Sequence, residues 1–75
     1  MMKYDVTVID STCKFYRLND ENGKRLVTIE FCGWKLFCKY NVCFASGAVE
    51  NNFDKDKNFR TLAEAKKYIA EVLSA

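Results

Sequence analysis

The side chains best suited to chemistry are four cysteines, Cys13, Cys32, Cys38 and Cys43, in a chain that contains no histidine. Their spacing includes no C-x-x-C pair, so we predict neither a structural zinc site nor a Cys–His nucleophile. The amino terminus lacks the apolar run of a signal peptide, which favours reduced thiols acting as small buried apolar groups. The alternative is two disulfides in one of three pairings.

Carboxylates and glycines give no clearer signal for catalysis. The acidic residues at 54 and 56 alternate with lysines, and those at 20 and 21 lie in an expected turn, so both groups are typical of solvated loops. The three glycines stand alone, which excludes a glycine-rich phosphate loop. We therefore predict that the protein is not an enzyme and holds no metal or cofactor.

One stretch predicts a helix, Phe59 to Leu73. Thr61 and Glu64 have the spacing of a capping box, and apolar side chains recur at helical intervals from Leu62 onward. A helix of this length is marginal alone, so its apolar side must pack against other elements.

Alternating apolar residues predict strands over 3–9, 13–18, 24–32, 34–44 and 48–53, with a loop at 54–58. The first strand is expected to bury one face, and the long stretch 34–44 to be a central strand with its even-numbered residues under the helix. The second strand is ambiguous, because Phe15 and Tyr16 are adjacent and compete for the core. Asn22-Gly23 predicts a tight hairpin turn.

These elements predict a single α+β domain over residues 1–75. It is a four- to five-stranded antiparallel meander sheet with one C-terminal helix packed on one face. Twelve basic and ten acidic residues give a net charge of only +2, which provides no strong electrostatic attraction to nucleic acid or membrane. With no signal peptide or membrane span expected, the predicted location is cytoplasmic.

One helix covers one face of such a sheet, so the opposite face needs a role. We expect that face to carry Ile9, Phe37, Cys43, either Phe15 or Tyr16, and the cations Lys35 and Lys39 with Arg17 or Lys14. Aromatic residues flanked by cations are enriched at binding surfaces. The predicted function is therefore a non-catalytic protein-binding module, in which Lys35, Phe37, Lys39 and Arg17 contact a protein partner or a second copy. Alternatively, loop 46–58 covers the face, or these residues are too dispersed to form a patch.

Double-stranded DNA is the other candidate partner. A sheet followed by Phe59-x-Thr61-x-x-Glu64-Ala65 resembles the arm-type DNA-binding modules of phage and transposon integrases, which are related to the AP2 domain. The resemblance covers the strand from Trp34 onward and the first turns of the helix. It implies DNA contacts by Arg17, Arg25, Lys35 and Lys39.

The length, the composition and the capped terminal helix also resemble the small accessory proteins of phages and mobile elements. Many proteins of that kind bind a host enzyme or defence complex. The resemblance implies an inhibitor that occludes such a target through the open face of its sheet.

Overall fold

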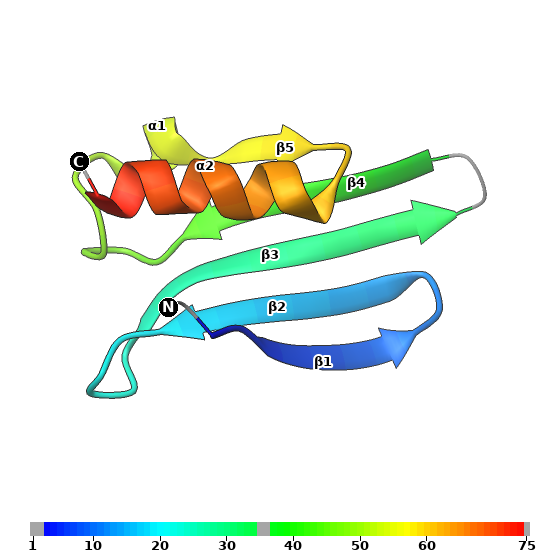
Figure 1. The fold of residues 1–75 in the computed structure, drawn as a ribbon, viewed down its shortest axis with the longest axis horizontal. Helices are drawn as coiled ribbons and strands as arrows, with labels where there is room; N and C mark the ends of the chain where they lie inside the picture. The colour runs from blue at the N-terminus through cyan, green and yellow to red at the C-terminus, as the bar shows by residue number, and fades with distance from the viewer. Residues whose placement is uncertain (1–2, 35–36, 75) are drawn as a thin grey trace.

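The computed structural model describes residues 3–34 and 37–74, with Trp34, Phe37 and Cys38 described by their backbone alone. Five strands form one antiparallel sheet in the order β1-β2-β3-β4-β5, and a C-terminal helix packs against it (Figure 1). The predicted α+β meander is confirmed. The elements are β1 Asp5–Asp10, β2 Cys13–Asn19, β3 Arg25–Trp34, β4 Phe37–Phe44, α1 Asn52–Lys55, β5 Lys57–Phe59 and α2 Leu62–Ser74.

Short polar turns join the first three strands. Asp20 accepts hydrogen bonds from the backbone N–H groups of Asn22 and Lys24, both at 2.9 Å, and Gly23 has a φ of 82°. The predicted turn at Asn22-Gly23 is therefore present. At the β1–β2 turn, the Asp10 carboxylate accepts hydrogen bonds from the Thr12 N–H and hydroxyl, each at 2.7 Å.

The prediction of one central strand over 34–44 is wrong. Trp34 is the last residue of β3, and it pairs with Phe37, the first residue of β4. Gly33, which lies between the predicted strands 24–32 and 34–44, is inside β3. A Cβ at Gly33 would lie 2.4 Å from Cζ of Phe31, so the glycine leaves room for that ring. In the order of the five strands, β3 and not the predicted strand 34–44 is the middle one.

The outer strand beyond β4 also differs from the prediction. Residues 48–53 were expected to form an edge strand, but they contain an isolated bridge residue and the start of α1. β5 falls instead in the predicted loop and at the predicted start of the helix. Phe59 explains the difference, because it pairs with Tyr40 of β4 and its ring lies 5.2 Å from the ring of Tyr68.

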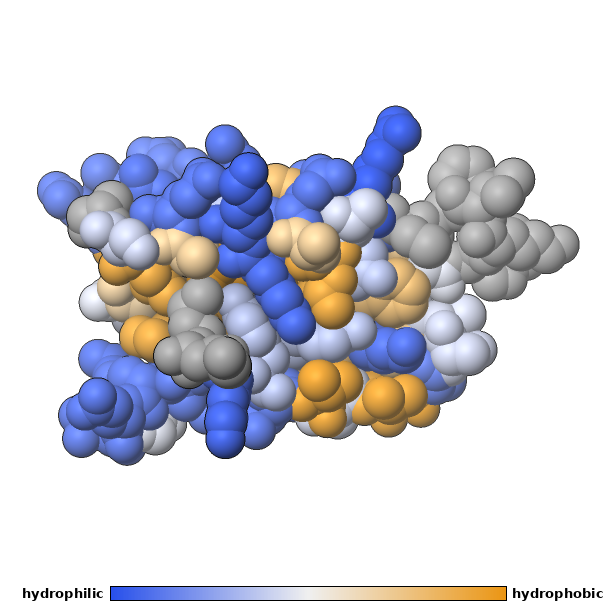
Figure 2. All heavy atoms as spheres, viewed as in Figure 1, coloured by the Kyte–Doolittle hydropathy of each residue, from blue (hydrophilic) through white to orange (hydrophobic). Residues whose placement is uncertain are grey.

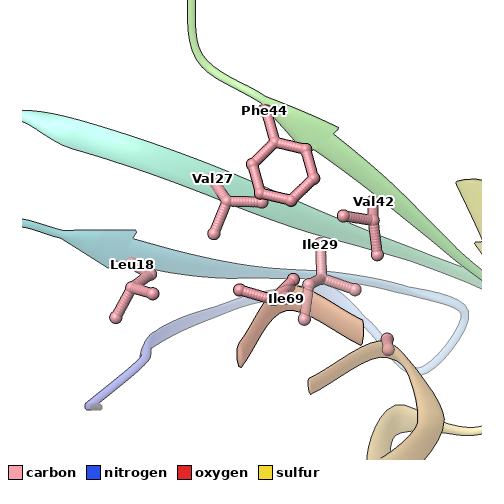
Figure 3. Close-up of a cluster of buried hydrophobic side chains, with 7 residues drawn as sticks. Leu18, Val27, Ile29, Val42, Phe44 and Ile69 are labelled. Atoms are coloured by element: carbon pink, nitrogen blue, oxygen red, sulfur yellow. The ribbon is translucent and has the colours of Figure 1, made fainter. Parts of the chain in front are cut away.

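Helix α2 begins as its capping signal predicts, since the Thr61 hydroxyl accepts the Glu64 N–H at 3.2 Å. Its buried residues, Ala65 and Ile69, lie against the sheet. The core combines them with side chains from the three inner strands, namely Leu18, Val27, Ile29, Val42 and Phe44 (Figure 3). The predicted packing of even-numbered β4 residues under the helix is confirmed for Val42 and Phe44. Within the described residues, neither helix is long and apolar enough to span a membrane.

Helix α2 covers only part of its face of the sheet. It lies closest to β4 and β5, shares the core with side chains of β2 and β3, and leaves β1 uncovered at the opposite edge (Figure 1). The prediction that β1 buries one face is therefore wrong, because all six of its residues are exposed. The ambiguity in β2 is resolved: Tyr16 packs against the core, while Phe15 alternates to the other face.

Candidate interaction surfaces

The face of the sheet opposite α2, called here the open face, is organised in three rows of residues that run across neighbouring strands. The rows follow from the strand register and consist of Asp10, Cys13, Cys32 and Lys39; of Thr7, Phe15, Glu30, Asn41 and Asn58; and of Asp5, Arg17, Thr28 and Cys43. Acidic, basic, amide, hydroxyl and thiol groups are mixed in these rows. Phe15 is the only large apolar side chain among these residues.

Arg17 occupies a fixed position on the open face. Its guanidinium group donates a hydrogen bond to the Thr7 hydroxyl at 2.6 Å and lies 5.2 Å from the centre of the Phe15 ring. The second contact has the geometry of a cation–π interaction. Arg17 of the predicted binding site is thus in contact with Phe15, one of the two aromatic residues considered for this face.

The other predicted site residues are not brought together by the described structure. Lys39 is exposed in the row of Cys13 and Cys32, on a different strand and in a different row from Arg17. Lys35 and the side chain of Phe37 lie outside the described residues. Ile9 lies at an irregularity in the β1–β2 pairing and is 60% exposed. The binding role of the predicted four residues stays a prediction.

Two further cations are also dispersed: Arg25, which the DNA alternative named as a contact, and Lys14, which was the alternative to Arg17 on the open face. Arg25 donates to the side-chain oxygens of Asn19 at 2.7 Å and Thr28 at 3.4 Å. Lys14 lies on the helix side of the sheet, 5.7 Å from the centre of the Phe31 ring.

The cysteines with described side chains, Cys13, Cys32 and Cys43, are free thiols. The prediction that they are buried is wrong, because Cys32 and Cys43 are exposed and Cys13 is only half-buried on the open face. The Cys32 thiol donates a hydrogen bond to the Glu30 carboxylate at 3.3 Å, and this bond raises the pKa of Cys32. Burial, followed by the charge of Asp56, raises the pKa of Cys43. Within residues 3–34 and 37–74, no cluster of three or more cysteine and acidic side chains could hold a metal ion.

Exposed apolar side chains gather on β1, one face of which was predicted to be buried. Val6 is 52% exposed, and Val8 and Ile9 are each 60% exposed. Val6 and Val8 pair with Tyr16 and Lys14, which places them on the helix side of the sheet. Figure 2 shows hydrophobic atoms on this side at the β1 edge, beyond the area that α2 covers.

The backbone of β1 is also available for pairing. Gly33 donates a hydrogen bond to the Thr12 carbonyl at 3.0 Å, so even-numbered residues of β2 bond to β3. Hydrogen-bonded and non-bonded pairs alternate in an antiparallel sheet, so odd-numbered residues of β2 bond to β1. Since their partners in β1 are Asp5 and Thr7, the peptide groups of Val6 and Val8 are directed towards the outer edge.

Two further surface features are separate from β1. Phe53 of α1 is 85% exposed but lies at the other edge of the sheet (Figure 1). A pocket of about 370 Å³ is lined by residues 48–51, Lys55, Val72 and Leu73. Its polar and apolar residues suggest no particular reaction.

Comparison with known proteins provides no independent assignment. No protein-family model matches the chain, and no curated protein or solved structure is significantly similar to it. The resemblances to integrase arm-type modules and to phage accessory proteins therefore stay predictions.

Proposed function

We propose that the protein is a non-catalytic protein-binding module that adds an extended segment of a partner protein to its sheet at β1. The exposure of Val6, Val8 and Ile9 on an outermost strand carries this proposal. Edge strands with exposed apolar side chains and outward-directed peptide groups are templates for strand addition. Proline and lysine, which often block such edges, do not occur between Asp5 and Asp10.

The chemistry of β1 specifies a partner with apolar side chains at alternate positions. Those side chains would cover Val6 and Val8 on the helix side, where α2 leaves the sheet uncovered. The strand has an exposed acidic residue at each end, Asp5 and Asp10. Hydrogen bonds from the Thr12 hydroxyl and N–H lower the pKa of Asp10, which keeps this carboxylate ionised. A matching segment therefore carries lysine or arginine near its ends.

The same charges favour a different protein over a second copy of this chain. An antiparallel self-pairing that buries the valines most fully sets Val6 of one copy against Val8 of the other. That register sets Asp5 of one strand opposite Ile9 of the other, one residue from Asp10, so two carboxylates come near each other at each end of the pair and repel. A partner segment with basic ends avoids this repulsion.

The open face does not have the charge distribution that binding to duplex DNA requires. Its cations are interspersed with acidic residues, as Asp5 is paired with Arg17 and Glu30 lies between the rows that contain Arg17 and Lys39. DNA-binding surfaces need clustered positive charge, because most contacts neutralise phosphates. In a complex formed at β1, the partner's segment would be sequestered, which is how a stoichiometric inhibitor acts.

The experiment that tests the proposal is selection of random dodecapeptides displayed on a surface, using the folded protein as the target. Selected peptides are expected to alternate apolar residues and to carry lysine or arginine near their ends. Isothermal titration calorimetry with synthetic copies measures their affinity. We expect Val8→Lys to weaken binding at least tenfold, because charged lysine side chains protect natural edge strands.

Lys39→Glu on the open face is the matched control, since it changes an exposed strand residue away from β1. This variant should bind the peptides as the unchanged protein does, and thermal melts should confirm that both variants fold. Loss of binding in Lys39→Glu but not in Val8→Lys would refute the β1 site and point to the open face. If the unchanged protein dimerises and Val8→Lys abolishes the dimer, the segment that pairs with β1 belongs to a second copy of this chain and not to a different protein. Salt-sensitive binding to duplex DNA with no peptide binding would refute the protein-binding function.

A further inference from the structure

Two cysteines face each other across neighbouring strands on the open face. Cys13 of β2 is paired in register with Cys32 of β3. The next pair along the ladder, Thr12 and Gly33, is joined by a backbone hydrogen bond of 3.0 Å. Because bonded and non-bonded pairs alternate, Cys13 and Cys32 form a non-hydrogen-bonded pair, in which the side chains are closest.

This type of position suits a disulfide. The Cα atoms of a non-hydrogen-bonded antiparallel pair lie about 4.5 Å apart, and disulfides span Cα separations of about 4.4 to 6.8 Å. The two strands therefore bring the thiols together without a rearrangement of the fold. The Cys13 thiol is also near enough to influence the titration of Cys32.

The pair is accessible to a reagent, because Cys32 is exposed and Cys13 is half-buried. Glu30 accepts the hydrogen bond of the Cys32 thiol at 3.3 Å and raises the pKa of Cys32, so the Cys32 thiolate forms by loss of its proton to water as the pH rises. Cys43 is separated from this pair, since it belongs to the row of Arg17 and Thr28.

We propose that Cys13 and Cys32 are a specific disulfide-forming pair, oxidised by thiol–disulfide exchange with a low-molecular-weight disulfide. The Cys32 thiolate attacks one sulfur of the reagent, giving a mixed disulfide and releasing one thiolate of the reagent. The Cys13 thiolate then attacks the Cys32 sulfur and expels the second. Two protein thiols and one reagent disulfide thus become one protein disulfide and two reagent thiols. The reagent receives both electrons and both protons.

The test uses the folded chain and oxidised glutathione. After acid quenching and alkylation of the remaining thiols, intact mass spectrometry should show that the number of alkylated cysteines falls from four to two. Trypsin separates all four cysteines into different peptides, since cleavage after lysine and arginine places Cys13 in peptide 4–14 and Cys32 in peptide 26–35. These two peptides should be recovered as one linked species, and dithiothreitol should separate them.

Three serine variants serve as controls. Cys13→Ser and Cys32→Ser should each form no internal disulfide, whereas Cys43→Ser should form the same linked pair as the unchanged protein. Oxidation in concentrated urea should give mixed pairings, which would show that the fold selects the partner. Four remaining thiols after treatment of the folded protein would overturn the proposal. A dominant link that includes Cys38 or Cys43 would overturn it equally.

Discussion

Two tyrosine hydroxyls near α2 occupy different polar environments. The Tyr4 hydroxyl is buried and has no hydrogen-bond partner among the described residues, and burial raises the pKa of Tyr4. The Tyr68 hydroxyl donates a hydrogen bond to the Lys55 carbonyl. An unpaired buried hydroxyl costs free energy, whereas a bonded one contributes stability. Both tyrosines are visible in the sequence, but this difference depends on neighbours that are distant in the chain.

Replacing each tyrosine by phenylalanine should therefore have opposite effects. Tyr4→Phe should leave the free energy of unfolding unchanged or raise it, because it removes a buried group without a partner. Tyr68→Phe should lower that free energy by about 1 kcal/mol through loss of its hydrogen bond. Urea denaturation measures both. A larger loss for Tyr4→Phe than for Tyr68→Phe would show that the Tyr4 hydroxyl is satisfied in solution.

Gly33 is the position where a single methyl group should disturb the sheet most directly. Its absent side chain leaves room for the Phe31 ring, which also lies 4.8 Å from the ring of Tyr40. Gly33→Ala would displace this ring, and we expect a loss of about 1 to 2 kcal/mol, which is typical of overpacking. The loss should shrink in a Phe31→Ala background. Equal losses in both backgrounds would mean that the ring is not the obstacle.

At the scale of elements, the sequence predicts helix α2 well and the connection between β3 and β4 poorly. Thr61 and the regular apolar spacing are local signals, and they suffice for the helix. Apolar residues occupy every even position from 34 to 44, so the pattern gives no sign that the chain reverses direction between β3 and β4. A different signal was present: helix-facing positions are odd in β3, as at Val27 and Ile29, and even in β4, as at Val42. Such a switch follows when strands reverse through a connection of two residues.

The packing of α2 should contribute more to stability than its cap. Ile69 is completely buried, so Ile69→Ala should lower the free energy of unfolding by about 3 kcal/mol, as for other large-to-small core changes. Thr61→Ala removes one capping hydrogen bond and should cost about 1 kcal/mol. Exposed Lys67→Ala is the reference, with an expected change within about 0.5 kcal/mol. If chemical denaturation ranks the cap above Ile69, helix docking is not the main source of stability.

At the scale of the whole molecule, the sequence predicts how many faces the helix covers but not where it lies on its face. Coverage follows from the width of one helix and the number of strands. The position of α2 across the sheet depends on which strands supply large side chains. The contact between the rings of Phe59 in β5 and Tyr68 in α2 places the helix near β5. The uncovered apolar residues therefore lie on β1, on the same side as the helix, and this placement could not be predicted from periodicity alone.

The topology predicts simple folding kinetics. Every strand pairs with its neighbour in the chain, so most contacts are formed between nearby segments, which favours fast folding. The chain has no proline, which removes the common cause of refolding phases that last about 10 to 100 s. Stopped-flow refolding of the reduced protein should show one exponential phase. A major phase on the timescale of minutes would indicate an intermediate or a slow association step.

The alternating direction of the peptide groups along β1 has a consequence for deuterium uptake. The amide protons of Asp5 and Thr7 are directed into the ladder and should exchange slowly with heavy water, whereas those of Val6 and Val8 should exchange almost as fast as in an unfolded peptide. Labelling of the isolated protein would then show an uptake pattern with a period of two residues along this strand. A partner strand bound at β1 would slow the exchange of the Val6 and Val8 amide protons and remove this two-residue period. Deuterium labelling would therefore detect binding at this edge before the partner is identified.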